Sequence, residues 1–233
     1  LLFSITPLLV LGLAMMKSFG SGADYFFPRQ IVWILISFFV FFLFSRIDWR
    51  LMKNSLFIVI IYLLGAASLI LLLFSGTKGV QSWFQFSFFS VQPSELMKII
   101  VILTLAQYLS HRHIEIYHFK HIIVSGVYVL IPLGLIFFQP DLGSAIILGF
   151  IWLGMILSSE ISKKHLFVLF LIFILISGLG WMYLLAPYQK ARIISFFNPY
   201  FDPGGKSYQA TQSMIAVGSG GFLGKGIGEG GQT

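Results

Sequence analysis

The stretch "VSGVYVLIPLGLIFFQPDLGSAIILGFIWLGMIL", residues 124–157, places one carboxylate, Asp141, between two apolar runs. Both runs approach the ~20 helical residues that cross a hydrocarbon core about 30 Å thick. Pro140 must end or break the helix before it, and Asp141 can then accept backbone N–H groups at the start of the next helix. The stretch therefore predicts two membrane helices with a very short connection and a carboxylate at their joint.

The composition of the 233-residue chain is that of a membrane protein. Hydrophobic residues make up 58%, aromatic residues 17% and charged residues 10%, whereas an average soluble domain has about 25% charged residues. The mean hydropathy of +0.92 agrees. The net charge is +7, but the basic residues are scattered among loops, which argues against nucleic acid as a partner. The sequence has no cysteine and so indicates neither a disulfide nor a thiolate ligand.

Apolar runs along the chain predict an all-α, polytopic helix bundle in residues 1–186. Helices are expected because a strand edge or loop exposed to lipid would leave backbone polar groups unpaired. The first run lacks an initiator Met and the basic start of a signal peptide, so we interpret the chain as a fragment. The seven predicted spans lie near residues 1–16, 31–45, 55–75, 96–110, 121–138, 142–158 and 166–186.

The distribution of basic residues predicts the orientation of these spans. Loops on one side carry Arg46, Arg50, Lys53, Arg112, Lys120, Lys163 and Lys164, and the short loops on the other side carry only Lys17, Arg29 and Lys78. The more basic side is expected in the cytoplasm, together with the N-terminus. Residues 187–233 would then form a truncated extracytoplasmic loop, and a long loop on a helical scaffold is a common place for function.

The stretch "GVQSWFQFSFFSVQPSELMKII", residues 79–100, is the first of three polar clusters. Pro93 suits the first turn of a helix, so Glu95 and Lys98 would share one helix face at i, i+3. The start of a helix is enough to explain both residues: the N-terminal helix dipole stabilises Glu95, and the long side chain of Lys98 reaches the membrane interface. Alternatively, a Glu/Lys pair near membrane depth marks a cavity.

Asp141, in "FFQPDLGSA", defines the second cluster and is open to the same two interpretations. As a helix cap it needs no further role. A carboxylate kept close to the apolar layer would instead require a cation, a metal or a polar ligand nearby.

The third cluster runs from Ala186 to Thr233 and reads "APYQKARIISFFNPYFDPGGKSYQATQSMIAVGSGGFLGKGIGEGGQT". It fits a loop with turns at its Pro and Gly residues. A G-x-G-x-x-G match at Gly226, Gly228 and Gly231 has no preceding strand, so it does not indicate a dinucleotide site. Backbone amides in the Gly-rich turns could bind an anion, together with the four basic side chains that lie on either side of Asp202 in the sequence, namely Lys190, Arg192, Lys206 and Lys225. The five histidines lie in the predicted cytoplasmic loops, where interfacial residues are more common than metal ligands.

Together, "GVQSWFQF…SVQPSELMK", "QPDLGSA" and "YQKARIISFFNPYFDPGGKSYQATQSMIAVGSGGFLGKG" resemble the shape, elongation, division and sporulation (SEDS) family of membrane proteins. The final "GQT" favours its rod-shape branch. The resemblance implies a ten-helix fold, of which this chain supplies the first seven helices and most of the external loop. Two positions depart from the family pattern: Ser207 stands where Gly is usual, and Gly231 where Thr is usual.

The resemblance also implies an activity, a location and a partner. The activity is that of a peptidoglycan glycosyltransferase, which polymerises lipid II at the outer face of the bacterial cytoplasmic membrane. The expected partner is a class B penicillin-binding protein. The family's catalytic acid falls on Asp202, and supporting positions fall on Glu95, Lys98 and Asp141, with Trp83 in the same first motif.

This chemistry needs a base for a sugar hydroxyl and positive charge for a departing pyrophosphate. Asp202 is the expected base, and Arg192, Lys206 and Lys225 are expected near the pyrophosphate. A divalent cation, Mg²⁺ or Mn²⁺, could assist at Asp141 or Asp202. Two alternatives remain open: a lipid II flippase, which would also need intramembrane acids and helix-breaking prolines, and a non-catalytic scaffold of the elongation machinery.

Overall fold

The computed structural model describes most of the chain, and its contacts divide the chain into two units. One unit comprises Leu1–Ile47 with Leu185–Thr233, and the other comprises Asp48–Leu184. The described residues are 2–17, 23–48, 53–74, 82–85, 89–111, 119–159, 162–198, 200, 205, 207–222 and 224–226.

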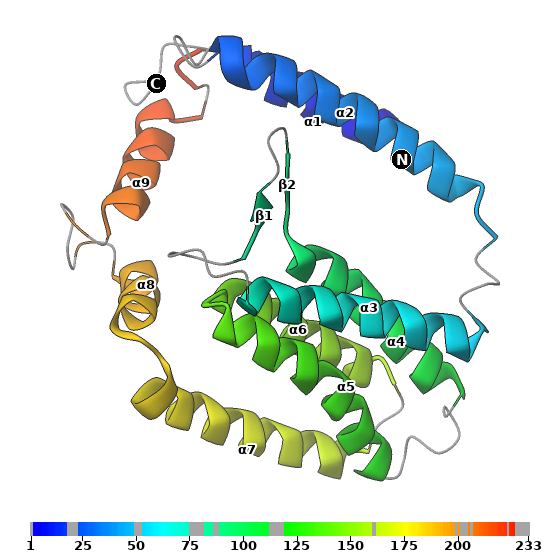
Figure 1. Ribbon diagram of the computed structural model, residues 1–233. Coiled ribbons are helices and arrows are strands. Elements are labelled where there is room, and N and C mark those ends of the chain that lie inside the picture. The colour runs from blue at the N-terminus through cyan, green and yellow to red at the C-terminus, as the bar shows by residue number, and fades with distance from the viewer. Residues whose placement is uncertain are drawn as a thin grey trace. The chain divides into compact units, whose positions relative to one another are not determined.

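The Asp48–Leu184 unit is a helical bundle with one short hairpin (Figure 1). Its strands, β1 (Phe84–Gln85) and β2 (Ser90–Val91), pair antiparallel, with Phe84 opposite Val91. The helices, in chain order, are α3 (Ser55–Phe74), α4 (Pro93–His111), α5 (Phe119–Phe138), α6 (Leu142–Leu157) and α7 (Lys163–Leu179), which continues into the π-helical turn η3 (Gly180–Leu184).

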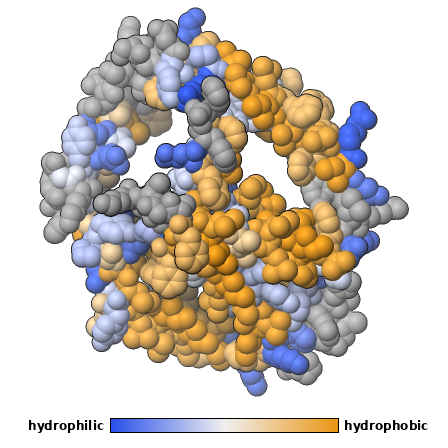
Figure 2. All heavy atoms as spheres, viewed as in Figure 1, coloured by the Kyte–Doolittle hydropathy of each residue, from blue (hydrophilic) through white to orange (hydrophobic). Residues whose placement is uncertain are grey.

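Helices α4 and α5 form the centre of this bundle, since each packs against three others: α4 against α3, α5 and α6, and α5 against α3, α4 and α6. The core around them contains Tyr62, Leu69, Met97, Val101, Leu105, Val129, Ile136, Ala145 and Leu148. On the face shown in Figure 2, apolar side chains also cover the outside of the bundle, as expected of helices in contact with lipid.

Small residues and polar contacts fix the spacing of the bundle helices. Tyr62 Oη donates to the Tyr128 carbonyl at 2.8 Å, which joins α3 to α5. Trp152 Nε1 donates to Ser125 Oγ at 3.1 Å, which joins α6 to α5. Helices in lipid gain little from excluding water from one another, so close packing and interhelical hydrogen bonds of this kind determine how they assemble.

Gly65→Leu is expected to lower the free energy of unfolding by about 1–3 kcal/mol. A Cβ at residue 65 would lie 2.8 Å from Met97 Sδ and 2.9 Å from Ile100 Cδ1, where α3 meets α4. Gly134→Leu is the matched control, because a Cβ there meets no described atom within 4 Å. The midpoint of thermal unfolding in detergent measures both effects, and equal midpoints would contradict close packing at Gly65.

The second unit contains α1 (Leu2–Lys17), α2 (Ala23–Ser45), α8 (Pro187–Phe197) and α9 (Tyr208–Gly220), and α1 packs against α2. Helix α8 starts with Pro187 in its first turn, where a missing N–H costs nothing. The Gln189 side chain accepts from the Ala186 N–H at 2.9 Å and closes this helix start. Two helices therefore lie in the segment that the sequence presents as a Gly- and Pro-rich loop.

Helices cover all seven apolar runs that the sequence predicts, although α2 begins at Ala23 and not near residue 31. Arg29 stacks over the Tyr25 ring, with Cζ 4.0 Å from its centroid, and this i, i+4 contact stabilises the additional turns. By length and composition, Tyr25–Ser45, Ser55–Phe74, Phe119–Phe138 and Lys164–Leu184 can each cross a membrane, and α1 and α6 are shorter apolar helices. The chain is thus a nearly all-helical, multi-pass membrane protein.

Candidate functional site

The first two polar clusters of the sequence meet where α4 and α6 begin. Gln92 Nε2 donates to Asp141 Oδ2 at 2.8 Å. The other carboxylate oxygen, Oδ1, accepts from the Ser144 N–H at 3.1 Å, so Asp141 caps α6 as expected. The residue that joins the clusters is Gln92, which the sequence analysis did not identify.

Both glutamines at this junction directly precede a proline. Gln92 precedes Pro93, the first residue of α4, and Gln139 precedes Pro140, which separates α5 from α6. The residue before a proline avoids helical backbone angles, so each Gln stands at a helix boundary. The repeated Gln-Pro dipeptide is the sequence signal that could have identified this contact.

Gln139 is almost fully buried at the junction, with 1% of its surface exposed. Its Nε2 donates to the Leu69 carbonyl of α3 at 2.9 Å, and its own backbone carbonyl accepts from Ser82 Oγ at 3.2 Å. Gln139 Oε1 and Ser94 Oγ are both buried and have no hydrogen-bond partner among the described residues. Each lies within two residues of the Gln92–Asp141 contact, so the junction is rich in buried polar atoms.

Glu95 and Lys98 share one face of α4, as their spacing predicts. Lys98 Nζ lies 2.7 Å from Glu95 Oε1. The Lys98 side chain is 15% exposed, whereas the Glu95 side chain is 58% exposed. The pair therefore places a largely covered cation fewer than two turns along α4 from Gln92, with its carboxylate partner on the outside.

Asp141 is half-buried and retains acceptor capacity. A carboxylate offers about four lone-pair positions, and two of those at Asp141 accept from Gln92 and Ser144. The remaining positions could bind a cation or a substrate donor. No three His, Asp or Glu side chains gather to form a metal site in the part of the chain that the structure describes.

The structure describes three of the other predicted site residues. Trp83 directly precedes β1 and is 47% exposed. Arg192 in α8 and Lys225 after α9 are exposed residues of the second unit. Asp202 and Lys206 lie outside the described residues. The structure thus brings Asp141 together with the stretch that precedes Glu95 and Lys98, and it describes the third cluster only in part.

The histidines that the structure describes make ordinary side-chain contacts. His121 Nδ1 lies 2.9 Å from Tyr108 Oη, and His165 Nδ1 lies 2.9 Å from Ser162 Oγ. The first contact joins α4 to α5, and the second lies within the start of α7.

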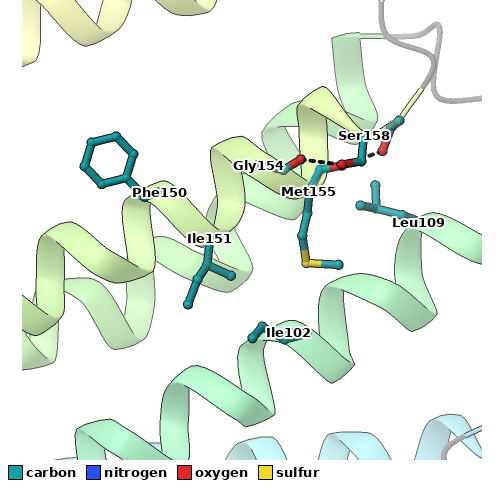
Figure 3. A pocket seen from close by; sticks show the side chains of 8 residues that line it. Ile102, Leu109, Phe150, Ile151, Gly154, Met155 and Ser158 are labelled. Carbon is teal, nitrogen blue, oxygen red and sulfur yellow. Dashed lines mark hydrogen bonds between the residues drawn. The ribbon is translucent and has the colours of Figure 1, made fainter. Parts of the chain in front are cut away.

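An apolar pocket of about 590 Å³ opens between the C-terminal halves of α4 and α6 (Figure 3). Its polar residues are serines whose hydroxyls are already used: Ser158 Oγ donates to the Gly154 carbonyl at 2.8 Å and Ser159 Oγ to the Met155 carbonyl at 2.9 Å. Because both helices begin at the Asp141 junction, the pocket lies toward their other ends. It contains no acid, base or cation and is unsuited to proton transfer. The residues that line it are Ile102, Leu109, Phe150, Ile151, Gly154, Met155, Ser158 and Ser159.

Comparison with known proteins gives consistent matches. Residues 1–233 match the family model FTSW_RODA_SPOVE, described as "Cell cycle protein". A curated relative, the probable peptidoglycan glycosyltransferase FtsW of Buchnera aphidicola subsp. Baizongia pistaciae, is 30% identical over 98% of this chain and 62% of the relative. The chain therefore spans about three fifths of the length of that relative.

Two solved structures share the fold. One, described as "Structural coordination of polymerization and crosslinking by a peptidoglycan synthase complex", has a TM-score of 0.72 and 30% identity, over 92% of this chain and 65% of that chain. The other, the rod shape determining protein RodA of Thermus thermophilus, has a TM-score of 0.63 and 23% identity, over 93% of this chain and 70% of that chain. The similar proteins carry both division-type and rod-shape names, so the branch stays a prediction.

Proposed function

Because this chain belongs to the SEDS family of membrane proteins, which includes FtsW, RodA and SpoVE, we propose that the protein it represents is a peptidoglycan glycosyltransferase. Its substrate would be lipid II, polymerised at the outer face of the bacterial cytoplasmic membrane. The observation that carries the proposal is the family match over all 233 residues. A relative of 30% identity named as a probable peptidoglycan glycosyltransferase supports it.

The reaction joins two lipid-linked sugars. The 4-hydroxyl of one substrate attacks the anomeric carbon of the other, a C–O bond forms, and the bond to undecaprenyl pyrophosphate breaks. Asp202 takes the hydroxyl proton as general base. Arg192, Lys206 and Lys225 balance the negative charge on the departing pyrophosphate. Asp141 orients a substrate group or a cation, supported by Glu95 and Lys98 in the first turns of α4.

The proposed arrangement in the cell follows from the same premise. The N-terminus lies in the cytoplasm, and residues 187–233 lie outside, where lipid II is consumed. A class B penicillin-binding protein cross-links the strands as they form. The similarity to a solved peptidoglycan synthase complex, described by its polymerization and crosslinking, supports a partner of this kind. We assign the protein to elongation and cell shape on the "GQT" of residues 231–233.

The product formed from lipid II tests the proposal. Full-length protein, purified in detergent and given labelled lipid II, is expected to form glycan strands with no membrane to cross. The Asp202→Asn variant, purified in parallel, controls for a contaminating polymerase, which would act equally in both samples. Lipid II that crosses vesicle membranes without forming polymer would overturn the proposal and favour a flippase. If the protein neither forms polymer nor moves lipid II across the membrane, the result would favour a scaffold.

A further inference from the structure

Both ends of one external segment are tied to the same turn. The hairpin segment, residues 82–92, is described at 82–85 and 89–92 and carries β1 and β2 (Figure 1). Ser82, near its start, donates through Oγ to the Gln139 carbonyl at 3.2 Å. Gln92, at its end, donates through Nε2 to Asp141 Oδ2 at 2.8 Å. Both acceptors belong to the α5–α6 turn, residues 139–141.

The α5–α6 turn is itself held in place from several sides. The Gln139 side chain donates to the Leu69 carbonyl, which ties the turn to α3. The Gln139 N–H donates to the Ile136 carbonyl at 3.0 Å, and the Asp141 carboxylate accepts from the Ser144 N–H. Ser82 and Gln139 are 2% and 1% exposed, so water cannot replace these bonds when they break. The turn is a rigid support for the hairpin segment.

The choice of glutamine at position 92 suits a carboxylate that must stay available. A neutral amide donates one hydrogen bond and fixes the orientation of Asp141, whereas Lys or Arg would neutralise its charge. Asp141 keeps acceptor positions open on its half-exposed side. Trp83 follows Ser82 directly, so its backbone is anchored while 47% of its surface remains exposed. A residue whose backbone is held in place loses less entropy when its side chain binds a ligand.

We propose that this double anchor positions the site: Ser82 and Gln139 fix the segment that carries Trp83, and Gln92 fixes the carboxylate of Asp141. Gln92 and Gln139 are positioning residues that touch no reacting atom. The anchor holds Trp83 and Asp141 in one constant geometry. Its effect on catalysis rests on the proposed function, whereas its effect on the hairpin segment does not.

A spin label tests the anchor independently of activity. Residues 1–233 contain no cysteine, so Gln85→Cys, at an exposed position of β1, provides one labelling site in them, and any cysteine elsewhere in the full-length protein is replaced by Ser beforehand. In full-length protein, Ser82→Ala and Gln92→Ala are each expected to increase the mobility of this label in electron paramagnetic resonance spectra. Gln107→Ala is the matched control, because Gln107 lies in α4, the helix that follows Gln92, and its amide donates to the Lys53 carbonyl at 3.0 Å, far from the turn. Unchanged spectra in both test variants would overturn the anchor.

A double-mutant cycle tests the role of Gln92 in the reaction. Gln92→Ala is expected to lower kcat/KM for lipid II roughly tenfold, less than the ~10²-fold that a misplacement of about 1 Å can cost. Because Gln92 acts through Asp141, adding Gln92→Ala to Asp141→Asn should cause no further loss. Independent, multiplicative losses would show that Gln92 has a general structural role and overturn the positioning role. If the parent protein forms no polymer, the proposed function fails, and the spin-label result still decides the anchor.

Discussion

Asp202→Asn is expected to lower the polymerisation of lipid II by full-length protein about 10²- to 10⁴-fold, the usual contribution of a general base. The carboxamide has nearly the shape of the carboxylate but cannot accept the proton of the sugar hydroxyl. Substrate binding should change much less, because the basic residues of the third cluster remain. Initial rates of glycan-strand formation over a range of lipid II concentrations measure kcat and KM separately.

The control for this variant must remove a charge without touching the reaction. Asp48→Asn makes the same chemical change directly after α2, in a loop that the basic residues assign to the cytoplasmic side. It should polymerise lipid II at the parental rate. Both variants should be expressed at normal levels and bind the penicillin-binding protein. Near-normal strands from Asp202→Asn would refute the base assignment.

The helices of this protein follow from its sequence because lipid leaves the backbone few choices. Each segment in a bilayer must satisfy its own hydrogen bonds, so an apolar run of sufficient length becomes a helix. This argument correctly predicts the helices on both sides of Asp141 and the end of α5 before Pro140. It fails where polar side chains extend a helix beyond the apolar run, as Arg29 and Tyr25 do at the start of α2.

The site could be predicted only in part, because its key contact joins distant parts of the chain. Gln92 and Asp141 are 49 residues apart, and hydrophobic periodicity does not relate them; the Gln-Pro dipeptide beside each of them is the one local signal that they share. Gln92 is uncharged, so charge alone indicates Glu95 and Lys98 as site residues and not Gln92, although Gln92 is the residue that contacts Asp141. The prediction that Asp141 and Asp202 face one cavity stays a prediction, since Asp202 lies outside the described residues.

Asp141→Asn is expected to lower polymerisation about 10²-fold while the protein folds normally. Asn Oδ1 can still accept from the Ser144 N–H, and the Gln92 amide can turn so that its Oε1 accepts from Asn Nδ2. Asn and Asp are also comparable helix caps, so the free energy of unfolding should change by less than about 1 kcal/mol. The loss of activity then reports the negative charge of Asp141 alone.

Asp141→Ala separates this charge from the structural role of the side chain. It removes the cap of α6, which costs about 1 kcal/mol, and leaves the half-buried Gln92 amide without its acceptor, which adds a part of the ~1–3 kcal/mol that a fully buried unpaired donor costs. Its thermal midpoint in detergent should therefore fall clearly below that of Asp141→Asn, although both lose activity. If Asp141→Asn polymerises lipid II at the parental rate and only Asp141→Ala is impaired, the carboxylate is a helix cap, and no cation or substrate group needs its charge.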